Sequence, residues 1–322
     1  MALEGGSGPM PEATIEVVLE NLGKAMDLRH MLSIGEHGGR FEVIDERIEN
    51  ATSYEGKTDP FFYYRFQRDR PVLFDFANAR RELRRENVRP EESILSQVRD
   101  PERYPVLSYI QNQYSDIRLF RNWAFGPAAL LRREQSTHGR GDFLEDGGEN
   151  LTLVLSKVAV HAKGELVESL RELYDGIVDL HFVIDGGTVQ LFLEEVGKRQ
   201  IPATRLSDGT LRYLCLLAIL LHPEPPPLVV IEEPELGLHP DIVPYLAQLM
   251  RRASERTQLV ITTNSQLLVN AFMESPEAIV VCERSDAETR FERLDADRLS
   301  GWLGRYTLGQ LWSMGEIGGN RW

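Results

Sequence analysis

A short apolar run that ends in two adjacent acids constrains the fold of this chain more than any other feature. Residues 228–231 (Leu-Val-Val-Ile) are long enough for one strand, and Glu232 and Glu233 follow directly. Short apolar strands between helical segments are typical of a parallel sheet buried on both faces. Ligands bind such sheets at the carboxyl ends of the strands. The sequence therefore predicts an α/β lobe with two carboxylates at its binding edge.

The elements around this run alternate regularly. We expect helices over 211–221, 241–255 and 266–272, and strands over 228–231, 258–262 and 278–282. Upstream we expect strands over 13–20, 31–34, 41–48, 61–66, 71–76 and 117–125, helices over 80–87, 101–114, 150–160 and 165–174, a loop over 133–148, and a hairpin of 178–184 with 188–196. The chain thus divides into a β-rich N-terminal part (1–100), a mostly helical insertion (101–177) and a C-terminal α/β lobe (178–322).

A polar turn, Ser207-Asp208-Gly209, opens the first of these C-terminal helices. A serine hydroxyl, a glycine and the unpaired N–H groups of a helix start can bind an anion, which the helix dipole also favours. A serine in this position can equally be an ordinary helix cap. The acidic strand that follows one helix later favours the anion site.

The two motifs, in this order, resemble the signature motif and Walker B of ABC-type ATPases of the RecF/SMC-like branch, a group of bacterial AAA-family ATPases. The resemblance is most specific over residues 200–275. It implies an α/β P-loop NTPase head of the ABC type that uses ATP and Mg²⁺. By the same resemblance, the signature motif holds Ser207, Asp208 and Gly209, Glu232 faces Mg²⁺, Glu233 is the catalytic glutamate, and Glu235 and His239 belong to the D-loop beside the nucleotide.

The chain departs from the family pattern at Asn264. The family carries a switch histidine in a Thr-His-Ser sequence, where this chain has Thr263-Asn264-Ser265. Asparagine can hydrogen-bond a γ-phosphate but cannot carry the charge of an imidazolium. We therefore expect Asn264 to take the catalytic position of the histidine, with slower or differently tuned hydrolysis.

A second departure concerns the phosphate-binding loop (Walker A). The only candidate is Ala51–Thr58, which contains Lys57 and is followed by Pro60 and an aromatic run. A P-loop must open a helix, so that its N–H groups and lysine converge on phosphate. We expect a hairpin tip here instead. Two accounts stay open: the chain starts late and has lost its P-loop, or it supplies its signature motif in trans to a partner's nucleotide.

Composition limits the partners. The 36 basic and 50 acidic residues give a net charge of −14, which argues against bulk binding of polyanions. An arginine cluster (residues 65, 68, 70, 80, 81, 84, 85 and 89) lies among aromatic residues and could contact nucleic acid, but intervening acids favour a solvated face. The seven histidines show no metal-ligand spacing. Two cysteines in apolar segments, expected to be buried, and the lack of a signal peptide or membrane-length apolar run predict a cytoplasmic protein.

The resemblance implies ATP hydrolysis coupled to head dimerisation, in DNA repair, DNA-end handling or defence against phage. The partner would be a second copy or another ATPase head, with a nuclease and DNA as further candidates and no membrane. Two alternatives stay open. The chain could be a non-hydrolysing scaffold subunit that gives its signature motif to a partner, or a nucleic-acid-binding protein that uses the arginine cluster.

Overall fold

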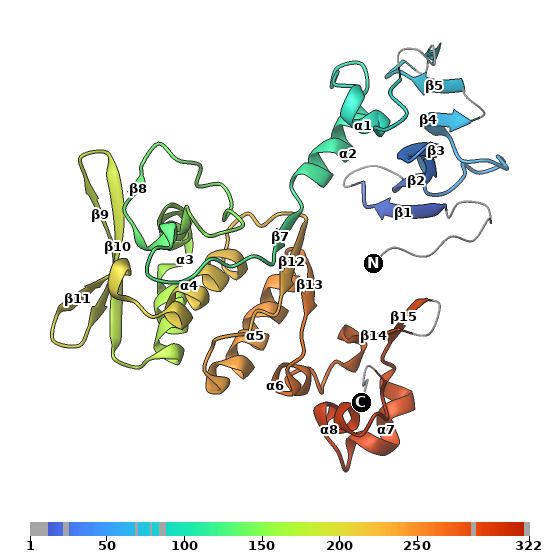
Figure 1. Cartoon of the computed structure of the whole chain (residues 1–322). Coiled ribbons are helices and arrows are strands. Elements are labelled where there is room, and N and C mark those ends of the chain that lie inside the picture. The colour runs from blue at the N-terminus through green and yellow to red at the C-terminus, as the bar shows by residue number, and fades with distance from the viewer. Residues whose placement is uncertain are drawn as a thin grey trace. The chain divides into compact units, whose positions relative to one another are not determined.

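The computed structural model describes residues 12–21, 26–67, 70–77, 79–83, 88–284 and 288–318 of the 322. The chain forms two compact units, Met1–Asp116 (unit 1) and Ile117–Trp322 (unit 2), and each is described by itself (Figure 1). No helix among the described residues is long and apolar enough to cross a membrane.

Unit 1 is built on one antiparallel sheet whose strands pair in sequence order. The strands are β1 (Ala13–Leu19), β2 (Leu28–His37), β3 (Arg40–Asn50), β4 (Phe62–Gln67), β5 (Arg70–Phe74) and β6 (Arg80–Glu82), and the helices are α1 (Ile94–Gln97) and α2 (Pro105–Ser115). Apolar side chains of the central strands, such as Leu28, Ile48 and Tyr64, pack against Leu107 and Ile110 of α2. The alternating pattern of these strands therefore predicts the sheet correctly, because every second side chain enters one small core.

Two expectations in unit 1 have definite outcomes. The stretch 80–87 was expected to be a helix, but Arg80–Glu82 is strand β6, and residues 84–87 lie outside the described part. Pairing with β5 overrides the helical propensity of these charged residues. The hairpin tip expected at Ala51–Thr58 is confirmed: it joins the antiparallel strands β3 and β4, and strand β4 rather than a helix follows it. Lys57 thus lacks the helix start that a P-loop needs.

Unit 2 holds a second antiparallel sheet. In it β10 (Thr188–Glu195) pairs with β8 (Gln135–Ser136), β9 (Ile177–Asp185) and β11 (Arg199–Pro202). The expected hairpin of β9 and β10 is confirmed, and the expected loop over 133–148 contains the short strand β8. The two helices expected over 150–160 and 165–174 are confirmed as the two segments of α3 (Leu151–Leu173), which a kink with non-helical backbone angles at Ala162 separates.

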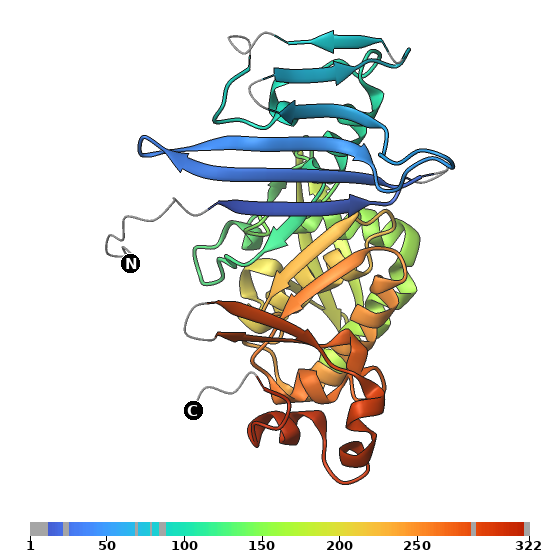
Figure 2. The same ribbon diagram turned by 90° about the vertical axis from the view of Figure 1, so that its right-hand side faces the viewer.

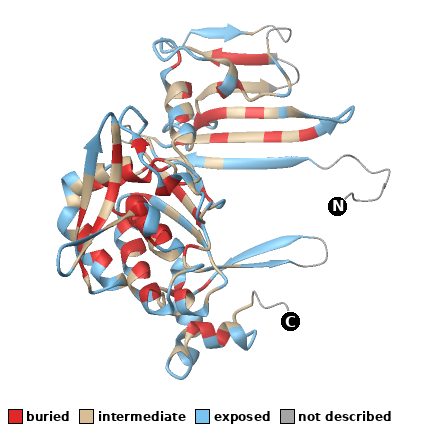
Figure 3. Ribbon diagram, turned by 60° about the vertical axis from the view of Figure 1, so that its left-hand side comes forward, coloured by how far each residue is buried: buried red, intermediate tan, exposed pale blue. Residues whose placement is uncertain are grey.

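A three-stranded parallel sheet carries the acidic run. Its order is β13 (Gln258–Thr262), β12 (Leu228–Glu232) and β7 (Arg118–Phe120). Two helices provide the connections: α4 (Asp208–Leu220) precedes β12, and α5 (Val243–Ser254) leads from β12 to β13. Every residue of α4 from Leu211 to Leu220 is buried, which confirms the helix expected from the longest apolar run (Figure 3).

Within unit 2, the described residues leave one face of this sheet uncovered. The pairing register aligns Leu119, Val230 and Val260 across the three strands, and Leu119 and Val260 are 42% and 44% exposed. On the other face, Phe120, Val229 and Ile231 enter the core with α4 and α5. Burial on both faces, expected from the apolar strands, is thus wrong for the described residues.

The remaining elements correct two further expectations. Strand β7 ends at Phe120 instead of residue 125. The strand expected over 278–282 is β14 (Val280–Arg284), which pairs antiparallel with β15 (Thr289–Arg293) in a ribbon of its own instead of joining the parallel sheet (Figure 2). The other helical elements are α6 (Gln266–Asn270), α7 (Ala296–Leu303), α8 (Leu308–Ser313) and the 3₁₀ turns η2 (Leu130–Arg132), η3 (Ala203–Arg205), η4 (Pro240–Ile242) and η5 (Pro276–Ala278).

The carboxyl end of α4 is capped by an arginine from beyond α5. Arg256 donates hydrogen bonds to the backbone oxygens of Leu220 (2.8 Å) and His222 (2.6 Å). A cation at this end also interacts favourably with the helix dipole. Arg256 therefore fixes the end of the helix that begins at the candidate anion site.

We expect Arg256→Ala to lower the free energy of unfolding by about 1–2 kcal/mol, because two helix-end carbonyls lose a charged donor. Chemical denaturation followed by circular dichroism measures this change. The matched control is Arg252→Ala, which removes a surface ion pair with Glu165 (2.7 Å) and should cost less than about 1 kcal/mol. Equal effects of the two substitutions would contradict the capping role.

The two cysteines differ, contrary to the expectation that both are buried. Cys215 is buried in α4 and Cys282 is exposed, and neither forms a disulfide. Burial raises the pKa of the Cys215 thiol. With an aromatic disulfide reagent at pH 8, we expect one thiol to react in the native protein and two after denaturation. Fast reaction of a Cys282→Ser variant would show that Cys215 is accessible.

Candidate functional site

The acids after β12 lie where the chain leaves the sheet. Glu232 is the last residue of the strand and is exposed, and its side chain makes no hydrogen bond or ion pair with any described residue. Glu233 has a φ of +44°, in the left-handed region that side chains rarely adopt. Its N–H donates to the backbone oxygen of Thr262 on the neighbouring strand (2.9 Å). The bond to β13 thus continues one residue beyond the strand and fixes the start of the acidic turn.

Asn264 comes from the end of the adjacent parallel strand. Its Nδ2 donates to Glu233 Oε1 over 2.7 Å. Glu232 pairs with Thr262 in the parallel register, so both chain segments leave the sheet at the same edge. The structure therefore joins the acid and the amide that the sequence singled out from separate motifs.

A second link connects the same two segments. Thr263 donates its hydroxyl hydrogen to Glu235 Oε1, and its oxygen accepts the N–H of Ser265 (2.9 Å). The other carboxylate oxygen of Glu235 is buried and has no hydrogen-bond partner among the described residues. Sequence reasoning missed Thr263, although its place between β13 and Asn264 could have marked it.

The start of α4 lies against the turn that follows the acids. Ser207 is the helix cap and accepts the N–H of Thr210 (3.0 Å). A Cβ atom on Gly209 would lie only 2.9 Å from the backbone oxygen of Gly237, so the glycine permits this close approach. The capping role of Ser207 is therefore clear, and the motif packs beside the acidic turn.

Asp208 is held by groups that the sequence did not indicate. Its Oδ1 accepts a hydrogen bond from the N–H of Gly126 (3.1 Å) and one from Arg132. Arg132 is buried and also donates to the backbone oxygen of Gly126 (2.8 Å). This carboxylate thus ties the loop after β7 to the start of α4.

His239 lies apart from these contacts. Its Nδ1 accepts the N–H of Asp241 over 3.4 Å and caps the 3₁₀ turn η4. Its side chain is 72% exposed. The described residues thus pair Glu233 with Asn264, and Glu235 with the adjacent Thr263. The side chains of Glu232 and His239 lie on the surface and make no hydrogen bond to these four residues.

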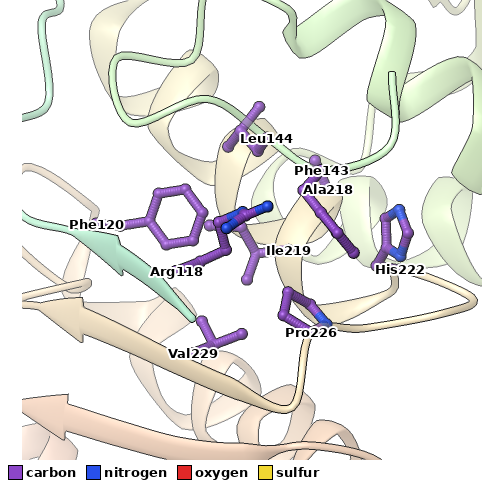
Figure 4. A pocket seen from close by; sticks show the side chains of 9 residues that line it. All are labelled: Arg118, Phe120, Phe143, Leu144, Ala218, Ile219, His222, Pro226 and Val229. Carbon is purple, nitrogen blue, oxygen red and sulfur yellow. The ribbon is translucent and has the colours of Figure 1, made fainter. Parts of the chain in front are cut away.

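Neither of two small hollows could hold a nucleotide. One measures about 10 Å³ and lies between β7, β12 and α4, with Arg118, Phe143 and His222 in its wall (Figure 4). The other, in unit 1, measures about 70 Å³ and is lined by Glu46 and Tyr64 among others. Small-molecule sites usually measure several hundred Å³. Among the described residues no three histidine, cysteine or acidic side chains form a metal cluster.

The arginine cluster of unit 1 is largely engaged with neighbours. Arg65 interacts with Glu49 and lies over the ring of Phe62, and Arg80 and Arg89 pair with Glu82 and Glu92. Arginines 68, 84 and 85 lie outside the described residues, as does the side chain of residue 70. The described arginines thus agree with the expectation of a solvated surface on which arginines pair with neighbouring acids.

These features define an α/β ATPase-like head of the P-loop NTPase class, with acids at the carboxyl edge of a parallel sheet. The sequence model of the family described as "AAA domain, putative AbiEii toxin, Type IV TA system" matches residues 11–270. The chain therefore belongs to this AAA-domain family, which agrees with the RecF/SMC-like resemblance of its motifs. No curated protein matches the sequence.

Solved structures of SMC heads are also similar to this chain. The SMC head domain with a coiled coil and joint from Pyrococcus yayanosii is 16% identical over 47% of this chain and 29% of its own, with a TM-score of 0.36. The SMC head bound to the winged-helix domain of ScpA is 11% identical over 84% and 76%, with a TM-score of 0.43. The Thermotoga maritima SMC head domain is 11% identical over 86% and 78%, with a TM-score of 0.34. This chain thus spans less than a third of the first of these proteins.

The left-handed backbone at Glu233 gives a stability prediction. Glycine adopts this conformation without the roughly 1–2 kcal/mol penalty of other residues. We expect Glu233→Gly to be about 1 kcal/mol more stable than Glu233→Ala, since both variants lack the carboxylate and differ only at Cβ. Denaturant titration measures the difference. At Glu232, which has ordinary strand conformation, the alanine variant should be more stable than the glycine variant. If glycine were the more stable at both positions, the left-handed conformation of Glu233 would be contradicted.

Proposed function

We propose that this chain is an ATP-hydrolysing head of the RecF/SMC-like kind and that it contributes one half of a nucleotide site. In this proposal Glu233 polarises the attacking water, and Asn264 orients Glu233 and reaches the γ-phosphate. The observation that carries it is the hydrogen bond between Asn264 Nδ2 and Glu233 Oε1, at the carboxyl edge of the parallel sheet. A strand end without function would not require an acid in a strained conformation beside an amide.

The acids suit Mg²⁺ in a limited way. Mg²⁺ is commonly held by one or two carboxylates together with substrate phosphates and water. Glu232 is exposed without a partner, and Glu235 carries a buried carboxylate oxygen without one. In the proposal Glu232 faces the metal, which would supply charge neutralisation at the phosphates. The phosphates would complete its coordination, in keeping with the lack of a three-ligand cluster among the described residues.

The other half of the site would come from polypeptide outside the described residues. The open apolar face at Leu119, Val230 and Val260 supports this, because parallel sheets are normally covered on both faces. The position of Lys57 in a hairpin tip supports it as well. We propose that Ser207, Asp208 and Gly209 present the start of α4 to the nucleotide, and that Glu235 and His239 flank it. Asp208 would act by holding α4 in place.

The finer parts of the proposal rest on the family resemblance. Residues 1–100 would form the N-terminal part of the head, 101–177 an insertion and 178–322 the lobe with the signature motif and Walker B. The head would work as a dimer or with another head, in DNA repair or anti-phage defence, with a nuclease or DNA as further partners. Two free thiols support a reducing cytoplasmic location.

ATP turnover tests the proposal, measured on the assembly that a tagged copy of this chain forms in its own cells. We expect Glu233→Gln to reduce kcat at least about 100-fold, as for loss of a general base, and Asn264→Ala to reduce it about tenfold. Glu255→Gln changes an exposed acid at the end of α5 and is the matched control, with no expected effect. Wild-type turnover by Glu233→Gln would refute the role of Glu233.

Turnover by the chain alone gives a separate test of the half-site. We expect the purified chain to hydrolyse little or no ATP, and Lys57→Ala to change nothing, since Lys57 lies in a hairpin tip. Rapid hydrolysis that Lys57→Ala abolishes would contradict this. An assembly that binds ATP without hydrolysing it would instead favour the non-hydrolysing scaffold.

A further inference from the structure

Arg212 is a buried cation within the most apolar helix of the protein. It is 8% exposed, and its neighbours Leu211 and Tyr213 are fully buried. A buried charge is costly unless it is paired or hydrogen-bonded. Among the described residues Arg212 makes no ion pair, and its Nε is buried without a partner. Burial of this guanidinium thus has a desolvation cost that a methionine of similar size would not have.

The guanidinium is directed at the acidic turn. Its Nη2 donates to the backbone oxygen of Glu233 over 2.8 Å. The rings of Trp123 and Phe125, stacked on each other at 10°, lie 5.6 and 5.8 Å from the guanidinium carbon. These aromatic faces favour a cation and limit its movement. Burial lowers the pKa of Arg212, and the carboxylates of Glu235 and Glu233 act in the opposite direction.

The contact completes the restraint of Glu233. The N–H of Glu233 is bonded to β13 through Thr262. Its carbonyl oxygen accepts one hydrogen bond from Arg212 of α4 and one, within the turn itself, from the N–H of Leu236 (3.1 Å). The peptide planes on both sides of its Cα atom are therefore held. Strained backbone persists only where the surroundings over-determine it. Without Arg212 the carbonyl is tied only to Leu236, which moves with the turn and not with α4. Relaxation of φ would then turn the Cα–Cβ bond and carry the carboxylate away from Asn264.

We infer that Arg212 is a positioning residue that holds the Glu233 turn in its left-handed conformation and so aims the Glu233 carboxylate at Asn264. The same helix begins at Ser207 and touches the Gly237 turn through Gly209, so a shift of α4 at the nucleotide face would be transmitted to Glu233. This inference deepens the proposed function and rests on it for the catalytic role of Glu233. Its structural part, the restraint of the turn, stands on the contacts alone.

A double-mutant cycle tests the restraint without ATP. When Arg212 is present, the equilibrium constant of folding should be about five times larger for the Glu233→Gly variant than for the Glu233→Ala variant. If Arg212 imposes the left-handed turn, Arg212→Met should reduce that ratio to less than twofold, because the alanine variant can then relax. Arg212→Leu, which also removes the donor, replaces Arg212→Met if the latter does not fold. An unchanged ratio in the Arg212 variant would overturn the inference.

Arg251 provides the matched control. It also donates to a backbone oxygen, that of Ala271, lies 4.9 Å from the ring of Phe272 and has a buried Nε without a partner. Arg251→Met should therefore leave the glycine-to-alanine ratio at position 233 at about fivefold. A fall equal to that in Arg212→Met would show a general loss of packing and overturn the inference.

Turnover of the assembly separates this inference from the proposed function. We expect Arg212→Met to reduce kcat about tenfold with KM unchanged, and Arg212→Lys to retain part of the wild-type kcat. In a protein that already carries Glu233→Gln, Arg212→Met should not reduce kcat further. Unchanged kcat in an assembly that hydrolyses ATP would overturn the positioning role while the proposed function stands. An assembly without turnover would refute the proposed function, and the stability cycle would still decide the restraint.

Discussion

The backbone turn at Glu233 is the constraint on which the rest of the candidate site depends. Strand β12 ends at the carboxyl edge of the sheet, and the left-handed conformation of Glu233 turns the chain away from the strand axis. Three elements hold that turn: β13 through the Thr262 carbonyl, α4 through Arg212, and the segment after β13 through Asn264. Each bond comes from a different part of the sequence, so the site exists only when the whole lobe is folded.

The sequence was sufficient to predict the elements that depend on the local pattern of apolar and polar residues. Alternation predicted the strands of unit 1, and the apolar run with its acids predicted β12 and the edge where Glu233 and Asn264 meet. The sequence was not sufficient where the fold depends on which strands pair with each other. Residues 278–282 were predicted to form a buried parallel strand, yet β14 pairs with the polar β15, a choice that a single strand does not encode. Arg132, Arg212 and Thr263 were missed because their roles depend on contacts with distant residues. A charge inside the apolar α4 was the one signal available for Arg212.

The same contacts support the proposal that this chain carries one half of a nucleotide site. The lobe positions acids and the start of α4, but its parallel sheet exposes the apolar residues Leu119 and Val260 on one face. The glycine-lysine sequence of unit 1 lies in a hairpin between β3 and β4, where no helix start can converge on phosphate. Family membership makes the chain ATPase-like. We propose in addition that this chain positions a carboxylate and that other polypeptide binds the phosphates.

Paramagnetic NMR with Mn²⁺ as a probe for Mg²⁺ tests the central claim, that these acids form a metal-facing edge beside Asn264. In protein labelled with ¹⁵N-asparagine, we predict that substoichiometric Mn²⁺ broadens the side-chain amide of Asn264 before that of the buried Asn150. Glu232→Gln should remove this preference, whereas Glu255→Gln should keep it. Equal broadening of both amides, or an Asn264 signal that Glu232→Gln leaves just as sensitive, would contradict the account.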